Sequence, residues 1–284
     1  MNITLQRACD IFGNAKPPRE VWERQFDYCD EEFKQLCATP LDRIESNDLW
    51  YYYHNLSYSE LQPEVFAYLF PRCLMEWHES LMRNEACGAG DAEFHYSILQ
   101  GRIFETMMTG EQREQVYRFF IDSFLTRLDQ ERGWVIKGEK TPVFCWTARL
   151  NSLAIVMPRI DALWGEWFPV STPGRAFAAV EYLASLIYEP ADNPFFPPLI
   201  PGRTISVFLL TNHDSHIIDA GWMEENLRFL RSVLTYRFVV ETLNDAAAIL
   251  REEPEYPTVA QCTEDVQSRR DLVEFHIELM FEVL

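Results

Sequence analysis

Basic residues are scarce in this chain. Its 284 residues include 25 Lys and Arg against 44 Asp and Glu, which gives a formal net charge of −19. A protein that binds nucleic acid needs clustered cations to displace counterions from phosphate, whereas cations here form only short pairs such as Arg269-Arg270. Direct binding of nucleic acid is therefore not expected. The surplus of carboxylates instead favours solubility or a basic protein partner.

Cysteine pairs with metal-binding or redox spacing are also absent. The chain has 7 cysteines, an odd number, and none forms a CxxC. In a chain of this length, that pattern is typical of reduced thiols in the cytosol. The N-terminus lacks the basic and apolar regions of a secretion signal, and no stretch approaches the length of a membrane-spanning helix. The sequence thus predicts a soluble cytoplasmic protein that does not enter a membrane.

Common catalytic motifs are missing as well. The sequence has no GxGxxG, no Walker A loop, no GxSxG elbow, no HExxH and no Cys/His zinc pattern. No cysteine stands beside a histidine or a basic cluster that would lower the pKa of its thiol. No cofactor is therefore expected. The absences favour a non-catalytic role, and an enzyme would have to be assembled from residues distant in sequence.

Large apolar side chains, in contrast, are plentiful. Hydrophobic residues make up 48% of the chain and aromatic residues 14%, enough for a large core. In most of the chain they recur every three or four residues, which is the helical period. We therefore expect a mainly α fold, either an irregular multi-helix bundle or stacked helical pairs. The predicted helices span residues 17–37, 49–54, 64–83 with either a kink or a division into two short helices near Pro71, 91–108 behind the cap Asp91, 111–130, 147–168, 173–188, 222–234, 236–251 and 269–284.

Three segments depart from the helical period. Residues 131–146 carry β-favouring residues on either side of a polar, Gly-containing turn, so a small β-hairpin is expected there. Residues 189–202 contain five prolines and should form an ordered irregular loop. Residues 204–210 could be a buried strand or a short helix. We expect a single globular body in which the hairpin divides two helical halves: residues 1–284 overall, with halves at 1–132 and 147–284.

A short motif occurs twice. Pro71-Arg72 is followed by Trp77, and Pro158-Arg159 by Trp164, at the same spacing and each within an apolar helical run. A duplicated helical unit would explain the match, and stacked helical pairs often build interaction surfaces. Two short matches also arise by chance.

One polar group directly after the apolar run 204–210 carries metal-ligand residue types. His213 and His216 are three residues apart with Asp214 between them, and Asp219 follows. Imidazole nitrogens and carboxylate oxygens coordinate divalent metals such as Zn²⁺, so these residues are a candidate metal site. The group also contains ordinary helix-capping residues, which is the alternative interpretation.

A second group joins acids to imidazoles. It consists of Glu76, His78, Glu79, Asp91, Glu93 and His95. A carboxylate beside a histidine can serve as a base or as its orienting partner, although the same residues are common on a solvated helix face. His276 differs, because its spacing from Val273 and Met280 places it on an apolar stripe. A histidine satisfied within the core or an interface is expected there.

The run Phe66-Ala67-Tyr68-Leu69-Phe70-Pro71-Arg72 is preceded by Leu56 and Glu60 and followed by the predicted helix 111–128. Residues 56–128 thereby resemble uncharacterised bacterial helical proteins that carry an F-x-Y-x-x-P helix and a later amphipathic helix beginning near Glu-Gln. The resemblance implies a helical structure for this part of the chain and supplies no catalytic residue.

Charge, aromatic content and the missing motifs favour an acidic protein-binding module, such as an immunity-type protein or another antagonist of a basic protein. Carboxylates across such an interface should bring fast, salt-sensitive association. The predicted partner-binding residues are the acids expected to form the densest exposed acidic groups near the C-terminus: Glu224, Glu225, Glu252, Glu253 and Glu255. The alternatives are a metal-dependent hydrolase that uses His213, Asp214 and His216, and a structural subunit of a larger assembly held by aromatic contacts.

Overall fold

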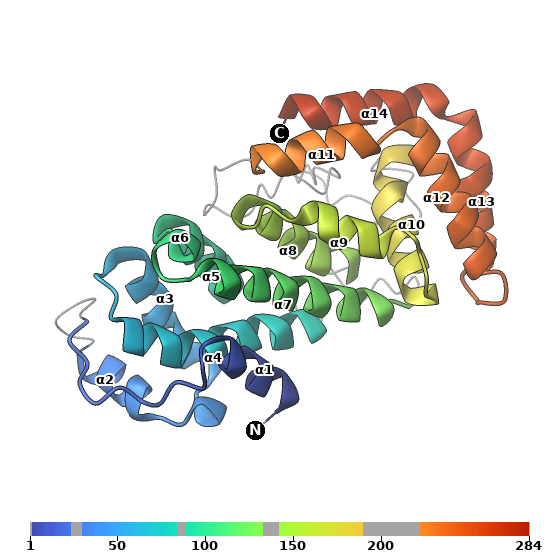
Figure 1. Cartoon of the computed structure of the whole chain (residues 1–284). Helices are drawn as coiled ribbons and strands as arrows, with labels where there is room; N and C mark the ends of the chain where they lie inside the picture. Colours follow the sequence, from blue (N-terminus) through green and yellow to red (C-terminus); the bar gives the residue numbers. More distant parts are fainter. Residues whose placement is uncertain (1, 24–29, 84–88, 133–141, 190–221, 284) are drawn as a thin grey trace, which may run out of the picture. The chain divides into compact units, whose positions relative to one another are not determined.

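The computed structural model describes residues 2–23, 30–83, 89–132, 142–189 and 222–283. Fourteen α-helices and two short 3₁₀ turns cover most of these ranges, and no β-strand occurs within them (Figure 1). The expectation of a mainly α, multi-helix fold is confirmed. Contacts divide the chain into two compact units, Met1–Asp122 and Ser123–Leu284.

The first unit is built around one long helix, α4. Its helices are α1 (Ile3–Ile11), α2 (Asp30–Ala38), α3 (Leu49–Tyr58), α4 (Pro63–Met82), α5 (Ala89–Gln100), α6 (Ile103–Thr106) and the first part of α7 (Gly110–Asp129). α4 is buried along most of its length because apolar residues occupy several of its faces, and α1 and α2 pack against it. Trp77 on α4 meets Phe120 on α7 at a ring-centroid distance of 4.7 Å.

α4 continues through Pro71 without a break. A proline inside a helix removes one backbone hydrogen bond and crowds the preceding turn. The neighbouring side chains of Phe66, Phe70 and Leu74 are buried, so the stabilisation gained by burying the helix on several sides offsets that cost. Of the two alternatives expected at Pro71, the division into two short helices is therefore wrong, and a kink stays a prediction.

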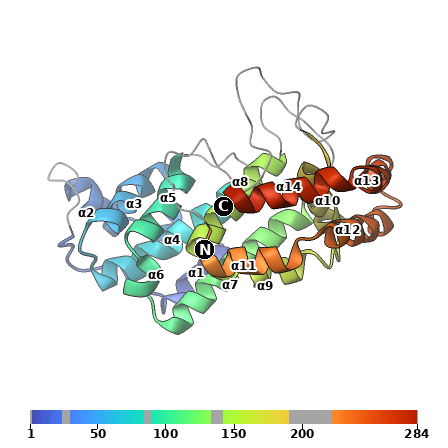
Figure 2. The same ribbon diagram turned by 90° about the horizontal axis from the view of Figure 1, so that it is seen from above.

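Two further helices of the first unit, α3 and α5, lie side by side (Figure 2). The Ser97 hydroxyl on α5 donates to the carbonyl of Tyr53 on α3 at 2.7 Å, and the rings of Tyr53 and Phe94 are 5.3 Å apart. Just after α5 the two backbones approach so closely that a Cβ added to Gly101 would collide with the carbonyl oxygen of Leu56. Glycine permits this approach because it has no Cβ.

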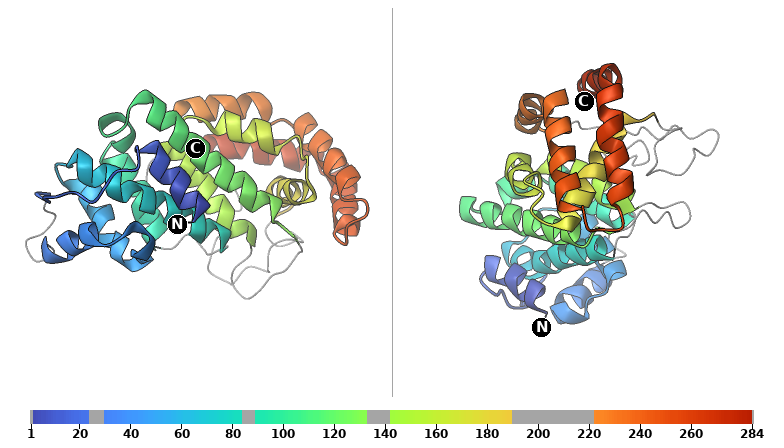
Figure 3. Two further views of the ribbon diagram at one scale, coloured as in Figure 1. Left: turned by 60° about the horizontal axis from the view of Figure 1, so that its bottom comes forward. Right: turned by 90° about the vertical axis from the view of Figure 1, so that its right-hand side faces the viewer.

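The second unit surrounds α10. After the end of α7, its helices are α8 (Pro142–Val156), α9 (Ile160–Trp167), α10 (Pro173–Ile187), α11 (Glu224–Val233), α12 (Tyr236–Ile249), α13 (Tyr256–Ser268) and α14 (Arg270–Val283). α10 is rich in alanine and larger apolar residues and is buried on all sides, with α12, α13 and α14 packed against it. α11 and α14 lie side by side (Figure 3), and Arg231 on α11 donates to the Phe281 carbonyl on α14.

Large aromatic rings fill the centre of the second unit. Trp146 and Trp167 meet edge-on at 5.3 Å, and Trp164 stacks on Phe168 at 4.2 Å. Tyr182 of α10 contacts Trp164 at 5.6 Å. Such ring pairs each contribute about 0.5–1.5 kcal/mol beyond the burial of their area. In this unit, many of the abundant aromatic residues therefore stabilise the core.

The expected hairpin at 131–146 is wrong in its second strand. Residues 142–146 form the start of α8, with Pro142 as its first residue, a position that tolerates the missing N–H of proline. Trp146 is buried in the aromatic core, where packing outweighs its preference for strands. Residues 133–141 lie outside the described residues. So do residues 190–202, with nearly all of the predicted loop, and 204–210, with the predicted strand or helix.

Several predicted helices are present with different ends. Among the described residues, the range 17–37 is helical only from Asp30, 91–108 is divided into α5 and α6, and 147–168 into α8 and α9. Asp91 lies inside α5 and is therefore not its N-cap. α1 and α13 are additional helices that the sequence pattern did not indicate. The predictions at 111–130, 173–188 and 236–251 correspond closely to α7, α10 and α12.

The repeated Pro-Arg motif adopts two different structures. Pro71 and Arg72 lie inside α4 and are buried. Arg159 instead precedes α9 as its N-cap, with a side chain that is 42% exposed. The motif therefore does not mark equivalent positions in two copies of one helical unit.

The boundary between the two units falls inside α7, after Asp122. The predicted halves, 1–132 and 147–284, divide the chain later than this boundary. A single globular body over residues 1–284 stays a prediction. None of the helices in the described ranges has the length and apolar character needed to span a membrane.

Candidate functional site

The predicted metal ligands His213, Asp214 and His216, together with Asp219, lie outside the described residues. Within the ranges that the structure describes, no group of three or more His, Cys, Asp or Glu side chains is arranged to hold a metal ion. The metal-dependent hydrolase therefore gains no support from these ranges, and the metal site stays a prediction.

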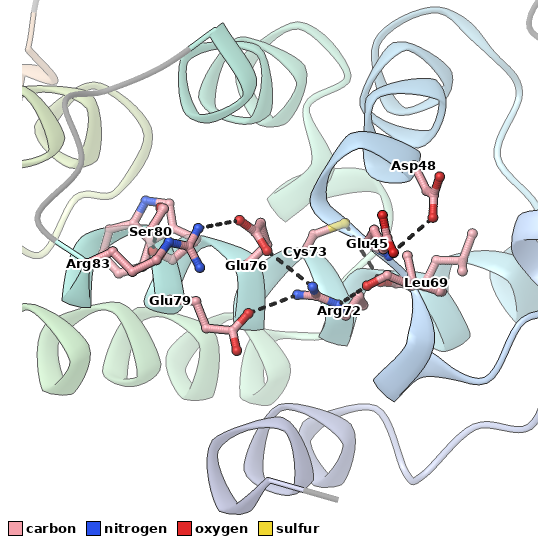
Figure 4. Close-up of polar contacts among 11 residues, drawn as sticks. Glu45, Asp48, Leu69, Arg72, Cys73, Glu76, Glu79, Ser80 and Arg83 are labelled. Carbon is pink, nitrogen blue, oxygen red and sulfur yellow. Dashed lines mark hydrogen bonds and ion pairs between the residues drawn. The ribbon is translucent and has the colours of Figure 1, made fainter.

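Two acids of the second candidate group, Glu76 and Glu79, pair with arginines instead of histidines (Figure 4). Glu76 accepts hydrogen bonds from Arg72 at 3.1 Å and from Arg83 at 3.0 Å, and Glu79 lies 3.5 Å from Arg72. Burial raises the pKa of Glu76, but hydrogen bonds from Ser46 and Arg83 and the charges of both arginines outweigh it and hold the pKa below its ordinary value. Glu76 is therefore a charged structural partner and not a proton donor.

The same network fixes the segment that leads into α3. Arg72 Nε donates to the Ile44 carbonyl at 3.0 Å. The next turn is closed by the Glu45 N–H, which donates to the Asp48 carboxylate at 3.1 Å (Figure 4). Since a buried charge-assisted hydrogen bond is costly to break, the Arg72 contact fixes Ile44, and the exposed Glu45–Asp48 bond closes the turn between it and α3.

The two histidines of the second group lie in separate surroundings. His95 is fully buried and its Nε2 lies 3.1 Å from Trp77 Nε1, which donates to it. Burial and the charge of Arg7 lower the pKa of the His78 imidazole. The contacts described for this group therefore tie Glu76 and Glu79 to arginines and His95 to a tryptophan.

Other side chains of types that often take part in catalysis are buried, and their surroundings make them unreactive. His276 is 4% exposed, and its Nδ1 lies 3.0 Å from the Leu186 carbonyl oxygen, so it is the satisfied core histidine that the sequence predicts. Burial raises the pKa of the Cys37 thiol to about 12 and that of Cys262 to about 11. Protonated thiols are poor nucleophiles, which argues against cysteine catalysis at these positions.

Glu131 and Glu181 form a buried carboxyl pair in the second unit. Burial, followed by the charge of Glu131, raises the pKa of Glu181 well above its ordinary value, and burial also raises the pKa of Glu131. Arg127 donates to both carboxylate oxygens of Glu131 at 3.2 Å. The exposed fractions are only 2% for Glu131 and 4% for Glu181, which leaves a substrate no access. The pair is therefore part of the core.

The predicted partner-binding acids do not form one surface. Glu224 and Glu225 are exposed in the first turn of α11, whereas Glu252 and Glu253 lie in the connection between α12 and α13. The rest of α11 and all of α12 lie between the two pairs in the sequence. Figures 1 and 2 show the first turn of α11 well apart from the connection between α12 and α13. The expectation that Glu255 is exposed is wrong: it is 6% exposed, because it directly precedes α13 and its side chain is enclosed there.

An exposed aromatic row runs along α3. Trp50, His54 and Tyr58 follow one another at intervals of four residues, which places them on one side of the helix. Trp50 is 45% exposed and Tyr58 is 62% exposed. The His54 ring lies between them, with its centroid 4.1 Å from that of Trp50 and 6.2 Å from that of Tyr58. Three rings thus lie in line along the surface of one helix.

Side chains from α5 complete this surface. The hydroxyls of Tyr58 and Tyr96 are 3.3 Å apart, and Glu93 Oε1 lies 3.7 Å from His54 Nε2. Neither α3 nor α5 contains a Lys or an Arg. We call the set of Trp50, His54, Tyr58, Glu93 and Tyr96 the α3–α5 face. It combines solvent-exposed rings with a carboxylate, two kinds of group that attract cations.

Comparisons with known proteins do not assign this chain to a family. No protein-family model, no curated protein and no solved structure matches it. The resemblance of residues 56–128 to bacterial helical proteins therefore stays an expectation, and a function has to be inferred from the described residues themselves.

Proposed function

We propose that the chain is an acidic protein-binding module of the cytoplasm that engages a basic protein partner. The observation that carries this proposal is the α3–α5 face, where exposed aromatic rings and a carboxylate lie together on two helices without a Lys or Arg. Tryptophan and tyrosine are the residues that most often anchor protein interfaces, and carboxylates beside them favour a positively charged partner.

The overall charge supports the same kind of partner. A formal net charge of −19 attracts a basic protein over a distance of several ångströms and increases the rate of encounter. Exposed acids outside the face, such as Glu224 and Glu252, would add to this attraction without contacting the partner. An immunity-type protein, or another antagonist that neutralises a basic protein, is the class that we favour.

The cytoplasmic location is inferred from the thiols. The four cysteines whose side chains are described, Cys9, Cys37, Cys73 and Cys262, are all free and buried. Free thiols in a chain of this size are typical of a reducing compartment.

Binding of the wild-type chain to charged peptides tests the proposal. Three peptides of equal length, in which serine alternates with arginine, glutamine or glutamate, would be titrated and followed by fluorescence anisotropy. We expect only the arginine peptide to bind, with an affinity that falls about tenfold between about 20 mM and about 300 mM NaCl because salt screens exposed charges. Equal binding of the arginine and glutamine peptides, or binding that ignores salt, would contradict the proposal.

A further inference from the structure

We infer that the α3–α5 face is the docking surface for an arginine-bearing segment of the partner, with one guanidinium over Trp50 and a second over Tyr58. This inference rests on the proposed function and adds to it the place of contact and the spacing of the cations. It follows from three properties of the face: its exposed rings, its carboxylates and its length.

The rings of the face are available to a partner. Single exposed aromatic residues are common on protein surfaces, but Trp50 and Tyr58 are exposed together on one side of one helix. His54 packs between them and leaves the outward parts of both rings in solvent. A guanidinium placed over such a ring is attracted by the negative face of its π system. Arginine suits the position better than lysine because its planar group stacks on aromatic rings.

Acidic residues flank the row in the sequence, and one contacts its middle. Exposed Asp48 immediately precedes α3, two residues before Trp50, and exposed Glu60 follows Tyr58 at the same interval. Glu93 lies beside the central His54. Each end of the row therefore has an exposed acid two residues away in the sequence, and Glu93 is the acid that contacts a ring of the row directly. This charge pattern favours a segment with a cation at either end over an apolar or an acidic one.

The length of the row sets the spacing of the two cations. A helix rises about 1.5 Å per residue, so the backbone positions of Trp50 and Tyr58, eight residues apart, are separated by about 12 Å. Their ring centroids are closer together, because only steps of 4.1 Å and 6.2 Å through the His54 ring separate them, so the long arginine side chains would converge slightly toward the rings. An extended peptide rises about 3.3 Å per residue, and two arginines separated by three residues are then about 13 Å apart. The face therefore fits an extended segment of the form Arg-x-x-x-Arg, in which the intervening residues cross His54.

Peptides with different arginine spacing test the inference in the full-length chain. Each peptide contains two arginines in a glycine and serine background, either adjacent or separated by three or by seven residues. Binding would be followed by nuclear magnetic resonance of the indole N–H groups of the eight tryptophans, with the Trp50 signal assigned from the Trp50→Phe variant. We expect the peptide with three intervening residues to bind most tightly and to shift the Trp50 signal most.

Variants of the face give the second arm of the experiment. Trp50→Ala and Tyr58→Ala should each weaken binding of the Arg-x-x-x-Arg peptide about two- to fivefold, the loss expected for one exposed cation–π contact, and should remove the preference for this spacing. Trp50→Phe and Tyr58→Phe retain a ring and should retain most of the affinity. The matched control is Phe275→Ala on α14, since Phe275 is an aromatic residue exposed to a similar degree, 54%; it should leave the affinity unchanged.

The outcomes separate this inference from the proposed function. If wild-type protein binds basic peptides with salt sensitivity, but Trp50→Ala and Tyr58→Ala bind as well as wild type, the contact lies elsewhere and the inference is overturned while the proposed function stands. Absence of binding to every basic peptide overturns both. Circular dichroism of each variant identifies loss of fold, and in that case the phenylalanine variants and the spacing series decide the result.

Discussion

At the scale of single residues, Glu23 is the buried acid with the most direct consequence for stability. Its carboxylate accepts hydrogen bonds from the Gln62 backbone N–H and from Asn55 Nδ2. Burial raises its pKa from 4.5 to about 7, although these hydrogen bonds oppose the increase. Because the folded pKa is higher than the unfolded one, the folded state holds the proton more tightly. The stability that this provides is complete below pH 4.5 and is lost as the pH rises through about 7.

We therefore predict that Glu23→Gln raises the free energy of unfolding by about 1–3 kcal/mol at about pH 8 and changes it little at about pH 4.5. The Asn55 side-chain amide can rotate so that its Oδ1 accepts a hydrogen bond from the amide introduced at position 23, because Asn55 Oδ1 makes no hydrogen bond with the described residues. Urea denaturation over this pH range measures the effect. Glu60→Gln is the control, since Glu60 is exposed. A variant that is less stable than wild type at both pH values would contradict the prediction.

A buried and an exposed ion pair of the same type allow a second comparison. Arg127 and Glu131 are four residues apart with side chains 5% and 3% exposed. Arg237 and Glu241 have the same spacing, with side chains 84% and 58% exposed. Water screens the exposed pair even though its atoms are closer, at 2.7 Å against 3.2 Å. Burial, and not distance, should therefore decide which pair contributes more.

Replacing each arginine with methionine measures this difference. Arg127→Met should lower the free energy of unfolding by about 3–5 kcal/mol, because it leaves Glu131 buried beside Glu181 without its cation. Arg237→Met should cost at most about 0.5 kcal/mol. Both values follow from chemical denaturation at neutral pH. Similar losses for the two variants would mean that the buried acids are neutralised by other groups.

At the scale of elements, local pattern predicted the helices whose apolar stripes are long and regular. The stripe of Val116, Phe120 and Phe124 indicated α7, and the ends of that helix agree closely with the prediction. α1 and α13 were not indicated because their buried stripes are short and built of few residues, such as Leu5 and Ala8 in α1. These two helices are stabilised by the helices against which they pack, and the local spacing of apolar residues carries no information about that packing.

The candidate surface was only partly visible in the sequence. The interval of four residues between Trp50, His54 and Tyr58 places them on one side of a helix, but the pattern does not say which side faces solvent. That is decided by α5, which covers Tyr53 through Phe94. Likewise, the acidic character of residues 252–255 is evident from sequence, whereas the burial of Glu255 depends on how the chain turns into α13.

Replacing two different glycines with alanine should change the stability of the fold in opposite directions. Alanine at Gly101 would place its Cβ against the Leu56 carbonyl, so α3 and α5 would have to separate, and Gly101→Ala should lower stability by about 1–3 kcal/mol. A Cβ at Gly165 in α9 meets nothing within 4 Å, so Gly165→Ala should raise stability by up to about 1 kcal/mol through helix propensity. Thermal melts of both variants test this. If Gly101→Ala melts at or above the wild-type temperature, the close approach of α3 and α5 is not required.

At the scale of the whole molecule, both units carry more acidic than basic residues. Like charges on a folded surface repel one another and destabilise the folded state, while a high net charge favours solubility. Exposed pairs such as Arg237–Glu241 and Arg270–Glu274 offset this repulsion only slightly, since each contributes about 0.3–0.5 kcal/mol. The same excess of negative charge is what would draw a basic partner toward the α3–α5 face.

We therefore expect salt to stabilise the chain while it weakens binding of basic peptides. Raising NaCl from about 10 mM to about 300 mM shortens the reach of surface charges to less than about 10 Å, which should raise the melting temperature at neutral pH. The increase should shrink at about pH 4.5, where many exposed carboxylates are protonated. Thermal melts followed by circular dichroism measure both effects. A melting temperature that falls with salt would show that attractive pairs outweigh repulsion, and an acidic surface balanced in this way would not steer a basic partner.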